Sequence, residues 1–440
     1  MADRERTNSG GARRAIRFSR DPLGFLDELR GTGPALVNAD VGIGPSLTIV
    51  TEPSLVRQVL VDDDERYRRP DIQAGRTIQL TQTGLIDSEG ALWEAQRKRL
   101  MSLFTPGRLE DYADTIAEVV TDITADWNDG HTVDLYDAMT RITVRVIARA
   151  LFSTALSRAE VDRFITANAT IGREFELSPV GVLRQVLPTR ASTEYRDAVT
   201  TLHEWAEELI ETRRAMTDPP DDLVTTMLRA DRDPEVDLPE NQIRDEVLTF
   251  LFAGHETTAL ALTYTLWFLG QHTAVADRVR TEVQGVCDGQ SHPDYADLAE
   301  LEYTEQVLQE ALRLRPPSWG IFRQANLDSR LGGSRIKRED YLLLPQWTLH
   351  RDGRFFEAPE RFEPSRWADR VPGDTPAYFP FGAGPHACIG RQLALTEAQF
   401  VVASLLARFD IETDAGAIDD LRPAGVLQPR GRVTATLQTR

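Results

Sequence analysis

Apolar residues recur at three- and four-residue spacing along most of the chain, and this period predicts helices with one face on a core. The period is clearest over residues 109–127, 133–152 and 195–214. A longer helix is expected to begin at Pro239, because proline fits the first helical turn, and to end near Gly270. This helix is apolar on nearly all sides, so we expect it to be buried.

Segments with the pattern of a strand are few and short. They lie at residues 46–50, 321–323, 341–344 and 433–437. They predict a small β region beside a large helical body, so the fold class is mainly α. The charged run DDDERYRR (62–69) and the proline-interrupted run DPPDD (218–222) are predicted to be solvated turns without a functional role.

No long linker rich in proline, glycine or serine divides the 440 residues. We therefore expect a single domain over residues 21–440. Residues 1–20 are polar and charged and are expected to be flexible. They lack both the apolar core of a signal peptide and the ~20 apolar residues that span a bilayer. This predicts a cytoplasmic protein without a membrane anchor.

Charge and cysteine content narrow the range of functions. The chain has 50 basic and 69 acidic residues, a net charge of −19, which does not favour binding to nucleic acid or to an anionic membrane. Its two cysteines, Cys287 and Cys388, are too few for a disulfide framework or for a zinc site built from cysteines. Each cysteine must therefore be judged by its neighbours.

The segment FPFGAGPHACIGR (379–391) surrounds Cys388 with glycine and proline, and a helical pattern follows it. Cys388 is thus expected at a helix N-terminus, where unpaired N–H groups and the helix dipole lower the pKa of a thiol. The thiolate is the form of cysteine that ligates a metal.

The neighbours of this cysteine suit a flat ring with a metal at its centre. Gly382, Gly384 and Gly390 let the backbone approach a ring closely, while Phe381 and Pro385 shield the sulfur. A thiolate on haem iron directs electron density toward O–O cleavage. A lone cysteine is more often a buried structural residue, but the arrangement of the whole segment favours a metal ligand.

The run FGAGPHACIG (381–390) resembles the haem-binding signature of the cytochrome P450 family, Phe-x-x-Gly-x-Arg/His-x-Cys-x-Gly. The resemblance extends from about Pro22 to the C-terminus. It implies the family's fold, a large helical body around haem b (iron protoporphyrin IX) with short mixed sheets.

The same signature assigns roles to individual residues by resemblance. It implies that Cys388 ligates the iron and that Phe381, Gly382 and Gly390 border the haem. His386 stands where most members of the family have arginine, and it is implied to bind a haem propionate.

Further segments resemble the family in the same order along the chain. Trp93 and Arg97 lie four residues apart, on one face of a helix, and resemble the family's Trp-x-x-x-Arg pair, which binds the propionates. Arg323 resembles another propionate contact, on a strand. By spacing alone, an exposed Trp–Arg stack is the simpler interpretation of the first pair.

Glu310 and Arg313 lie three residues apart on a helix that is expected to end before two prolines. Such pairs are common on surface helices. In the family this pair is buried and is joined by the arginine of a Pro-Glu-Arg-Phe segment, here 359–362, which makes Arg361 the third member. We expect the trio to be structural, because a buried arginine stays charged only among carboxylate and carbonyl partners.

The run AGHETT (253–258) places a carboxylate and two hydroxyls in the long buried helix, where they are costly unless paired or used. It resembles the family's oxygen-activation motif, Ala/Gly-Gly-x-Asp/Glu-Thr-Thr. Ala253 and Gly254 are thereby implied to border the haem. Glu256 and Thr257 are implied to deliver the protons for O–O cleavage, with the Thr257 hydroxyl turned away from a locally widened helix.

Two other interpretations of the sequence fail. His255 and Glu256 begin like a zinc-protease motif, but position 259 is Ala259 and the second histidine is missing. His255 is expected to be a spacer. No Gly-x-Gly-x-x-Gly run opens a helix after a strand, so nucleotide chemistry is not indicated.

Together these motifs predict a cytochrome P450 monooxygenase, an oxidoreductase that inserts one oxygen atom from O2 into an apolar small molecule. We recognise no reductase, flavin or ferredoxin domain, so electrons are expected from a separate ferredoxin or flavodoxin with its reductase. A peroxide-driven haem enzyme or an isomerase needs no electron partner, and a haem sensor has no turnover. Glu256 and Thr257 disfavour these alternatives, which need no proton relay.

Four segments are expected to face the substrate. They are the loop 70–85, the helix near 250–258, the stretch 318–321 and the turn near Val426. Phe250, Trp319, Ile321 and Leu427 predict an apolar cavity. Fatty acids, terpenoids and steroids are all compatible with it.

Overall fold

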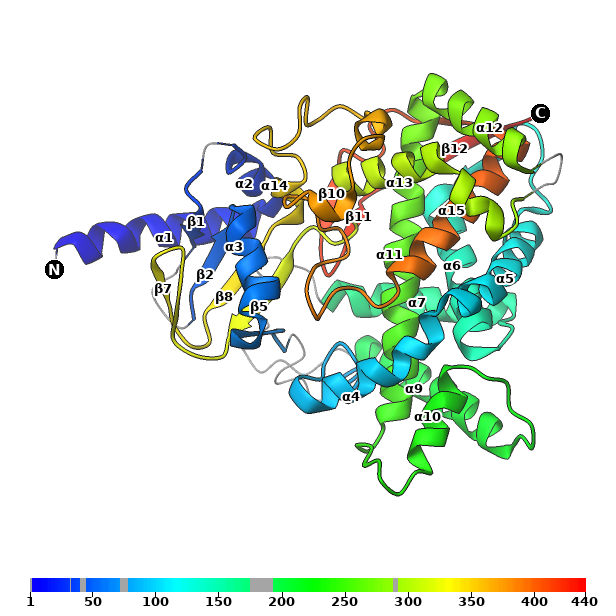
Figure 1. Cartoon of the computed structure of the whole chain (residues 1–440), viewed down its shortest axis with the longest axis horizontal. Helices are drawn as coiled ribbons and strands as arrows, with labels where there is room; N and C mark the ends of the chain where they lie inside the picture. The colour runs from blue at the N-terminus through cyan, green and yellow to red at the C-terminus, as the bar shows by residue number, and fades with distance from the viewer. Residues whose placement is uncertain (1, 32, 40–44, 72–77, 175–192, 288–291) are drawn as a thin grey trace.

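Helices make up most of the chain, and the largest sheet lies at one end, beside a large helical body (Figure 1). The computed structural model describes residues 2–31, 33–39, 45–71, 78–174, 193–287 and 292–440. The N-terminal helix lies at the sheet end, and the C-terminus lies at the far side of the helical body. The predicted fold class, mainly α with short mixed sheets, is confirmed.

The helical body is built from long helices, most of which turn an apolar face to the core. They are α5 (Pro106–Thr124), α6 (Leu135–Phe152), α7 (Arg158–Glu174), α9 (Thr193–Ala215), α11 (Gln242–Gln271), α12 (Thr273–Cys287), α13 (Glu302–Leu314) and α15 (Arg391–Arg408). The helices predicted from periodicity correspond to α5, α6 and α9, with ends that differ by a few residues.

Further α helices lie beside the sheets or within this body. They are α1 (Ala2–Arg20), α2 (Pro22–Glu28), α3 (Pro53–Arg57), α4 (Gly90–Leu100), α10 (Leu223–Asp231) and α14 (Gln346–Leu349). The short η helices are η1 (Gln58–Asp62), η2 (Asp64–Arg66), η3 (Met101–Phe104), η4 (Ala296–Glu300), η5 (Pro364–Trp367) and η6 (Pro372–Asp374).

Helix α11 runs through the middle of the helical body and packs against α6, α13 and α15 (Figure 1). Leu251, Leu260 and Leu266 are at most 1% exposed, and full burial of each leucine stabilises the fold by about 1.5–3 kcal/mol. The helix is buried as predicted, but it begins at Gln242 instead of Pro239. Asn241 takes a left-handed conformation with φ of 66°, which separates the helix from the turn before it.

The largest sheet has the strand order β1–β2–β8–β5–β3. The strands are β1 (Leu36–Asn38), β2 (Leu47–Val50), β8 (Tyr341–Leu344), β5 (Ile321–Ala325) and β3 (Tyr67–Arg68). β2 and β8 are parallel, and the other neighbours are antiparallel. Because alternate residues of a strand share a face, Ile321 and Arg323 point to the same side of β5.

The other strands form smaller sheets. The strands β4 (Thr132–Asp134), β12 (Thr434–Thr439) and β9 (Phe409–Thr413) form one sheet, and two hairpins pair β6 (Ser329–Leu331) with β7 (Ser334–Ile336) and β10 (Leu421–Pro423) with β11 (Leu427–Pro429). The four predicted strand segments correspond to β2, β5, β8 and β12.

Two polar segments without a predicted helix or strand have regular structure. Most of residues 1–20 belong to helix α1, and Phe18 near its end packs against Phe25 and Trp319. In the charged run 62–69, Tyr67 is 2% exposed and belongs to β3. Each segment contains one buried aromatic residue that packs against the rest of the chain. The surrounding charged residues made both segments resemble solvent-exposed chain. Among the described helices, none is long and apolar enough to cross a bilayer.

Candidate functional site

A cavity of about 500 Å³ lies between helix α11 and the loop that carries Cys388. Ala253 and Cys388 both line this cavity, and both are exposed, although Ala253 belongs to a helix that is otherwise largely buried. Such exposure in the middle of a buried helix marks an open space that side chains do not fill. Phe250 and Ile321 contribute to a wall that is mainly apolar.

At two positions of the cysteine loop, residues 379–390, the backbone has a conformation that only glycine adopts easily. Gly382 and Gly384 have φ of 72° and 70°, in the left-handed region. A Cβ at Gly384 would lie 1.9 Å from the carbonyl oxygen of Leu60. Gly384 therefore lets the loop pack closely against the backbone at Leu60. Inside the loop, the N–H of Cys388 donates to the carbonyl of Phe381 at 2.8 Å.

The thiol of Cys388 lies just before helix α15, as predicted, but its pKa is not lowered. Cys388 is open to the cavity, but protein atoms replace bulk water around its sulfur, and this desolvation raises the pKa above its ordinary value. The N–H of Gly390 and the charges of Arg97 and Arg391 act in the opposite direction. The prediction of a lowered pKa was therefore wrong, because it weighed the helix terminus and not the loss of water around the sulfur. A coordinated metal ion deprotonates a thiol outright.

A rim of aromatic and cationic side chains borders the cavity beside the cysteine loop. The rings of Trp93 and His386 are in contact, with centroids 3.9 Å apart and planes tilted by 35°, and the guanidinium carbon of Arg97 lies 5.7 Å from the Trp93 centroid. Arg323 reaches the same cavity from β5. Burial lowers the pKa of Arg97 and lowers that of Arg323 to about 10, so both side chains are charged at neutral pH.

His386 lacks one of its polar partners. Burial and the charge of Arg69 lower the pKa of His386 to about 4, although Glu89 opposes this change. The imidazole is therefore neutral at pH 7. Its Nδ1 atom is buried and has no hydrogen-bond partner among the described residues. An unpartnered buried nitrogen in a cavity wall points to a polar group of a bound molecule.

Arg69 lines the cavity, although the sequence placed it in a solvated turn without function. Its Nε donates to Glu89 Oε1 at 3.0 Å, and its Nη1 donates to the carbonyl of Leu85 at 2.9 Å. Arg69 follows β3, whose pairing with β5 brings it to the side of Arg323. The one available signal was Tyr67, an aromatic residue inside a charged run.

The residues around the cavity fit iron protoporphyrin. The apolar walls suit its flat ring. At the rim Arg69, Arg97 and Arg323 outnumber Glu89, an excess of positive charge that suits two propionates. Among the described residues no group of three histidine, cysteine, aspartate or glutamate side chains could hold a metal ion. One thiolate suffices, however, for an iron ion that a porphyrin already holds.

Helix α11 keeps its regular form through the AGHETT run, and no local widening is present. The hydroxyl of Thr257 donates to the carbonyl of Ala253 at 2.8 Å, so it does not turn away from the helix as expected. Thr257 still lines the cavity, and its oxygen keeps the capacity to accept a hydrogen bond. Gly254 also lines the cavity, and a Cβ there would lie 2.8 Å from Ile147.

Glu256 and His255 lie outside the residues that line this cavity. The Glu256 carboxylate accepts hydrogen bonds from Tyr136 Oη at 3.1 Å and from Gln428 Nε2. His255 is fully buried, with Nδ1 2.7 Å from the carbonyl of Leu251 and its ring beside Phe164. The packing of His255 is that of a structural residue.

The ion pair of Glu310 and Arg313 is fully buried, with Nε to Oε2 at 2.8 Å. The Arg361 side chain does not join it, because it is 74% exposed and lies near Glu363. Arg361 contributes only its carbonyl, which accepts a hydrogen bond from Arg313 Nη2 at 3.1 Å. The third member is Arg366, whose Nε donates to Glu310 Oε1 at 3.0 Å and whose side chain is 8% exposed.

A fourth member completes this network. The indole N–H of Trp367 donates to Glu310 Oε2 at 2.9 Å. The segment PSRW (364–367) has the same Pro-x-Arg-aromatic pattern as PERF (359–362), which was chosen instead. The second copy of the pattern was the signal that sequence analysis overlooked.

The residues expected to face the substrate divide into two groups. Phe250, Ile321 and Val426 line the cavity. Trp319 is 1% exposed, with its indole N–H donating to the carbonyl of Ala424, and Leu427 is fully buried. The last two are core residues, so their inclusion was wrong. Of the loop 70–85, residues 72–77 lie outside the described residues, and Leu85 lines the cavity.

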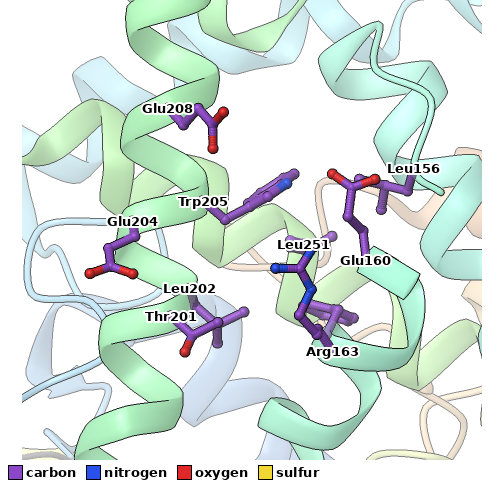
Figure 2. A pocket seen from close by; sticks show the side chains of 10 residues that line it. Leu156, Glu160, Arg163, Thr201, Leu202, Glu204, Trp205, Glu208 and Leu251 are labelled. Atoms are coloured by element: carbon purple, nitrogen blue, oxygen red, sulfur yellow. The ribbon is translucent and has the colours of Figure 1, made fainter. Parts of the chain in front are cut away.

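A second, smaller cavity of about 170 Å³ lies between α7 and α9 (Figure 2). Trp205 lies in the middle of this view, with Glu208, Glu160 and Arg163 around it. No cysteine lines this cavity. The chemistry of a thiolate therefore belongs to the larger cavity.

Known proteins resemble this chain over most of its length. The family model for cytochrome P450 matches residues 30–436. Cyclooctat-9-en-7-ol 5-monooxygenase of Streptomyces melanosporofaciens is 35% identical over 407 residues, which cover 90% of this chain and 86% of the relative. Cyclooctatin synthase of the same species is 32% identical, with coverage of 93% and 90%. Pentalenene oxygenase of Streptomyces avermitilis is 29% identical, with coverage of 94% and 93%.

Proposed function

Because the chain belongs to the cytochrome P450 family and is a haem-dependent monooxygenase of apolar small molecules, we propose that its substrate is a terpene hydrocarbon or a terpene alcohol. The names of the three relatives support this class. The observation that carries the proposal is the apolar wall formed by Phe250, Ile321 and Val426. The arginines that line the cavity gather at its rim, where haem propionates would pair with them.

This proposal predicts a preference that can be measured by binding. In the haem-loaded protein, cyclooctat-9-en-7-ol or pentalenene is expected to bind at least about tenfold more tightly than dodecanoate, because burial of an unpaired carboxylate costs more than burial of a hydroxyl. Titrations followed by the Soret absorbance give the three dissociation constants. Tighter binding of dodecanoate would contradict the terpenoid assignment and favour a fatty acid.

We propose the following roles in holding haem. Cys388 would supply the thiolate that ligates the iron. Trp93, Arg97, Arg323, His386 and Arg69 would bind the propionates, and Phe381, Gly382, Gly390, Ala253 and Gly254 would border the ring. When bound, haem supplies the activation of O2, for which two electrons and two protons must arrive for each oxygen atom inserted.

We propose that Thr257 and Glu256 handle these protons. Thr257 lies in the cavity wall, and its oxygen can accept a hydrogen bond and pass a proton onward. Glu256 is the next residue toward the N-terminus, is partly exposed and does not line the cavity, so we expect it to take up protons from outside the cavity. An acid and an alcohol side by side, joined by water, are suited to relay protons into an apolar space.

Replacement of Thr257 by alanine is expected to leave haem binding intact and to divert electrons to hydrogen peroxide. Product formed per NADH consumed should fall about tenfold or more, because the cavity loses its hydroxyl for proton transfer. A matched control is Thr263→Ala: Thr263 donates to the carbonyl of Ala259 in the same way but does not line the cavity. Equal coupling in both variants would remove Thr257 from the relay.

We also propose that a ferredoxin or flavodoxin of the cytoplasm, with its reductase, delivers the electrons. Two exposed cations near the cysteine loop support an acidic partner of this kind. Lys98 follows Arg97 on α4, and Arg391 opens α15 next to the loop.

A further inference from the structure

The Glu256 carboxylate is held by two donors from different parts of the fold. Tyr136 at the start of α6 donates from 3.1 Å, and Gln428 of β11 donates to the same oxygen, Oε1. In the described part of the chain, no arginine or lysine forms an ion pair with Glu256. The proposed proton donor is thus held by hydrogen bonds from two uncharged side chains.

Both donors are fixed in their roles. Burial and the charge of Glu256 raise the pKa of Tyr136 far above its ordinary value, so Tyr136 keeps its proton at neutral pH. The side-chain oxygen of Gln428 accepts a hydrogen bond from Arg422 on the paired strand β10. The amide nitrogen of Gln428 must therefore face Glu256.

The same hairpin reaches the substrate cavity. Gly425 and Val426, at the tip between β10 and β11, line the cavity. Val426 and Gln428 are two residues apart, on either side of Leu427. One therefore borders the cavity while the other holds the acid.

Leu427, between these two residues, is held in place because both its N–H and its carbonyl form hydrogen bonds to other parts of the chain. Its N–H donates to the carbonyl of Pro317 at 2.8 Å, and its carbonyl accepts a hydrogen bond from the Tyr264 hydroxyl. A molecule that pushes Val426 outward must turn the strand about this point. The turn displaces Gln428 on the other side of it.

We propose that Tyr136 and Gln428 are positioning residues that hold the Glu256 carboxylate outside the cavity, and that substrate contact with Val426 releases the carboxylate through the β10–β11 hairpin. The inference rests on the proposed role of Glu256 as proton donor. Before substrate binds, the acid is kept from Thr257 and protons are not delivered. When substrate fills the cavity, Glu256 is free to pass a proton that it takes from solvent to the Thr257 hydroxyl.

The first test measures the rate of NADH oxidation in the absence of substrate, in which electrons are consumed without product. With a ferredoxin and its reductase, Gln428→Ala is expected to raise substrate-free NADH oxidation about three- to tenfold, and Tyr136→Phe to raise it less, because one donor remains. Adding Glu256→Gln to either variant should return the rate to the wild-type value. The matched control is Gln438→Ala, which removes another amide donor to a carboxylate, that of Glu412, on the far sheet.

The second test observes the carboxylate itself and needs no turnover. The infrared band of Glu256 is identified by subtracting the spectrum of Glu256→Gln in the haem-loaded protein. Saturation with cyclooctat-9-en-7-ol is expected to shift this band in the wild type, because its hydrogen bonds are lost. In Gln428→Ala the band should already be shifted and should respond less to the ligand.

The outcomes separate this inference from the function on which it rests. If Glu256→Gln leaves the coupling of product to NADH unchanged, the acid role in the proposed function fails. If Glu256→Gln uncouples the enzyme, but Gln428→Ala and Tyr136→Phe match the wild type in both tests, the hairpin link is wrong. Tyr136→Phe alone decides the matter if Gln428→Ala does not fold.

Discussion

Replacing Cys388 with serine is expected to abolish product formation and the haem spectrum of the wild type. A neutral hydroxyl is a far weaker iron ligand than a thiolate and supplies less electron density for O–O cleavage. Haem content per polypeptide, the absorbance spectrum and product formation are the quantities to measure. The matched control is Cys287→Ser: Cys287 ends helix α12, is 4% exposed and does not line the cavity.

The two cysteine variants are expected to differ in haem content, in absorbance spectrum and in product formation. Cys287→Ser should keep the haem and its spectrum, because the change affects only packing. A Cys388→Ser protein that retained both the wild-type spectrum and turnover would show that another residue ligates the iron.

Replacing Glu310 with alanine is expected to lower the free energy of unfolding by about 3–5 kcal/mol. The loss leaves the buried cations of Arg313 and Arg366 and the indole N–H of Trp367 without their acceptor. Since the whole stability of a domain is about 5–15 kcal/mol, little haem-loaded protein should be recovered. Urea unfolding and haem retention after gel filtration measure the effect.

A pair of arginine variants tests the identity of the third member of this network. Arg366→Ala should be strongly destabilising, since it removes a charge from a buried carboxylate. Arg361→Ala should change the free energy of unfolding by no more than about 0.5 kcal/mol, because the side chain of Arg361 is exposed. If Arg361→Ala lowered the free energy of unfolding more than Arg366→Ala, the side chain of Arg361 would be the third member of the network.

Periodicity predicted a mainly helical chain and located α5, α6, α9 and α11, but it did not locate α7, α10 or α12. The long buried helix was recognised because its apolar residues cover every side, which no surface helix permits. Its first residue was misplaced because proline at position 239 suits a helix start, whereas the left-handed conformation of Asn241 excludes that start. Single conformations of this kind are decided by tertiary packing and leave little trace in the sequence.

The cysteine loop could be predicted because several residue types stand at fixed spacing within ten positions. Single residues brought together from distant segments could not. Arg69 enters the cavity only because β3 pairs with β5, a contact across more than 250 residues. A charged run has the same composition whether it meets solvent or a buried rim.

Electrostatic predictions from local sequence also had a clear limit. The position of Cys388 before α15 was predicted correctly, but the direction of its pKa was not, because burial is a property of the folded chain. The partners of Glu256 come from α6 and β11, and nothing in the AGHETT run indicates them. The run indicates that a carboxylate is present but not what holds it.

The most direct test of the central claim is the difference spectrum of the reduced protein with and without carbon monoxide. Thiolate ligation by Cys388 predicts a Soret band with a strong shift to longer wavelength. A Soret band at the position typical of histidine-ligated haem would contradict the account.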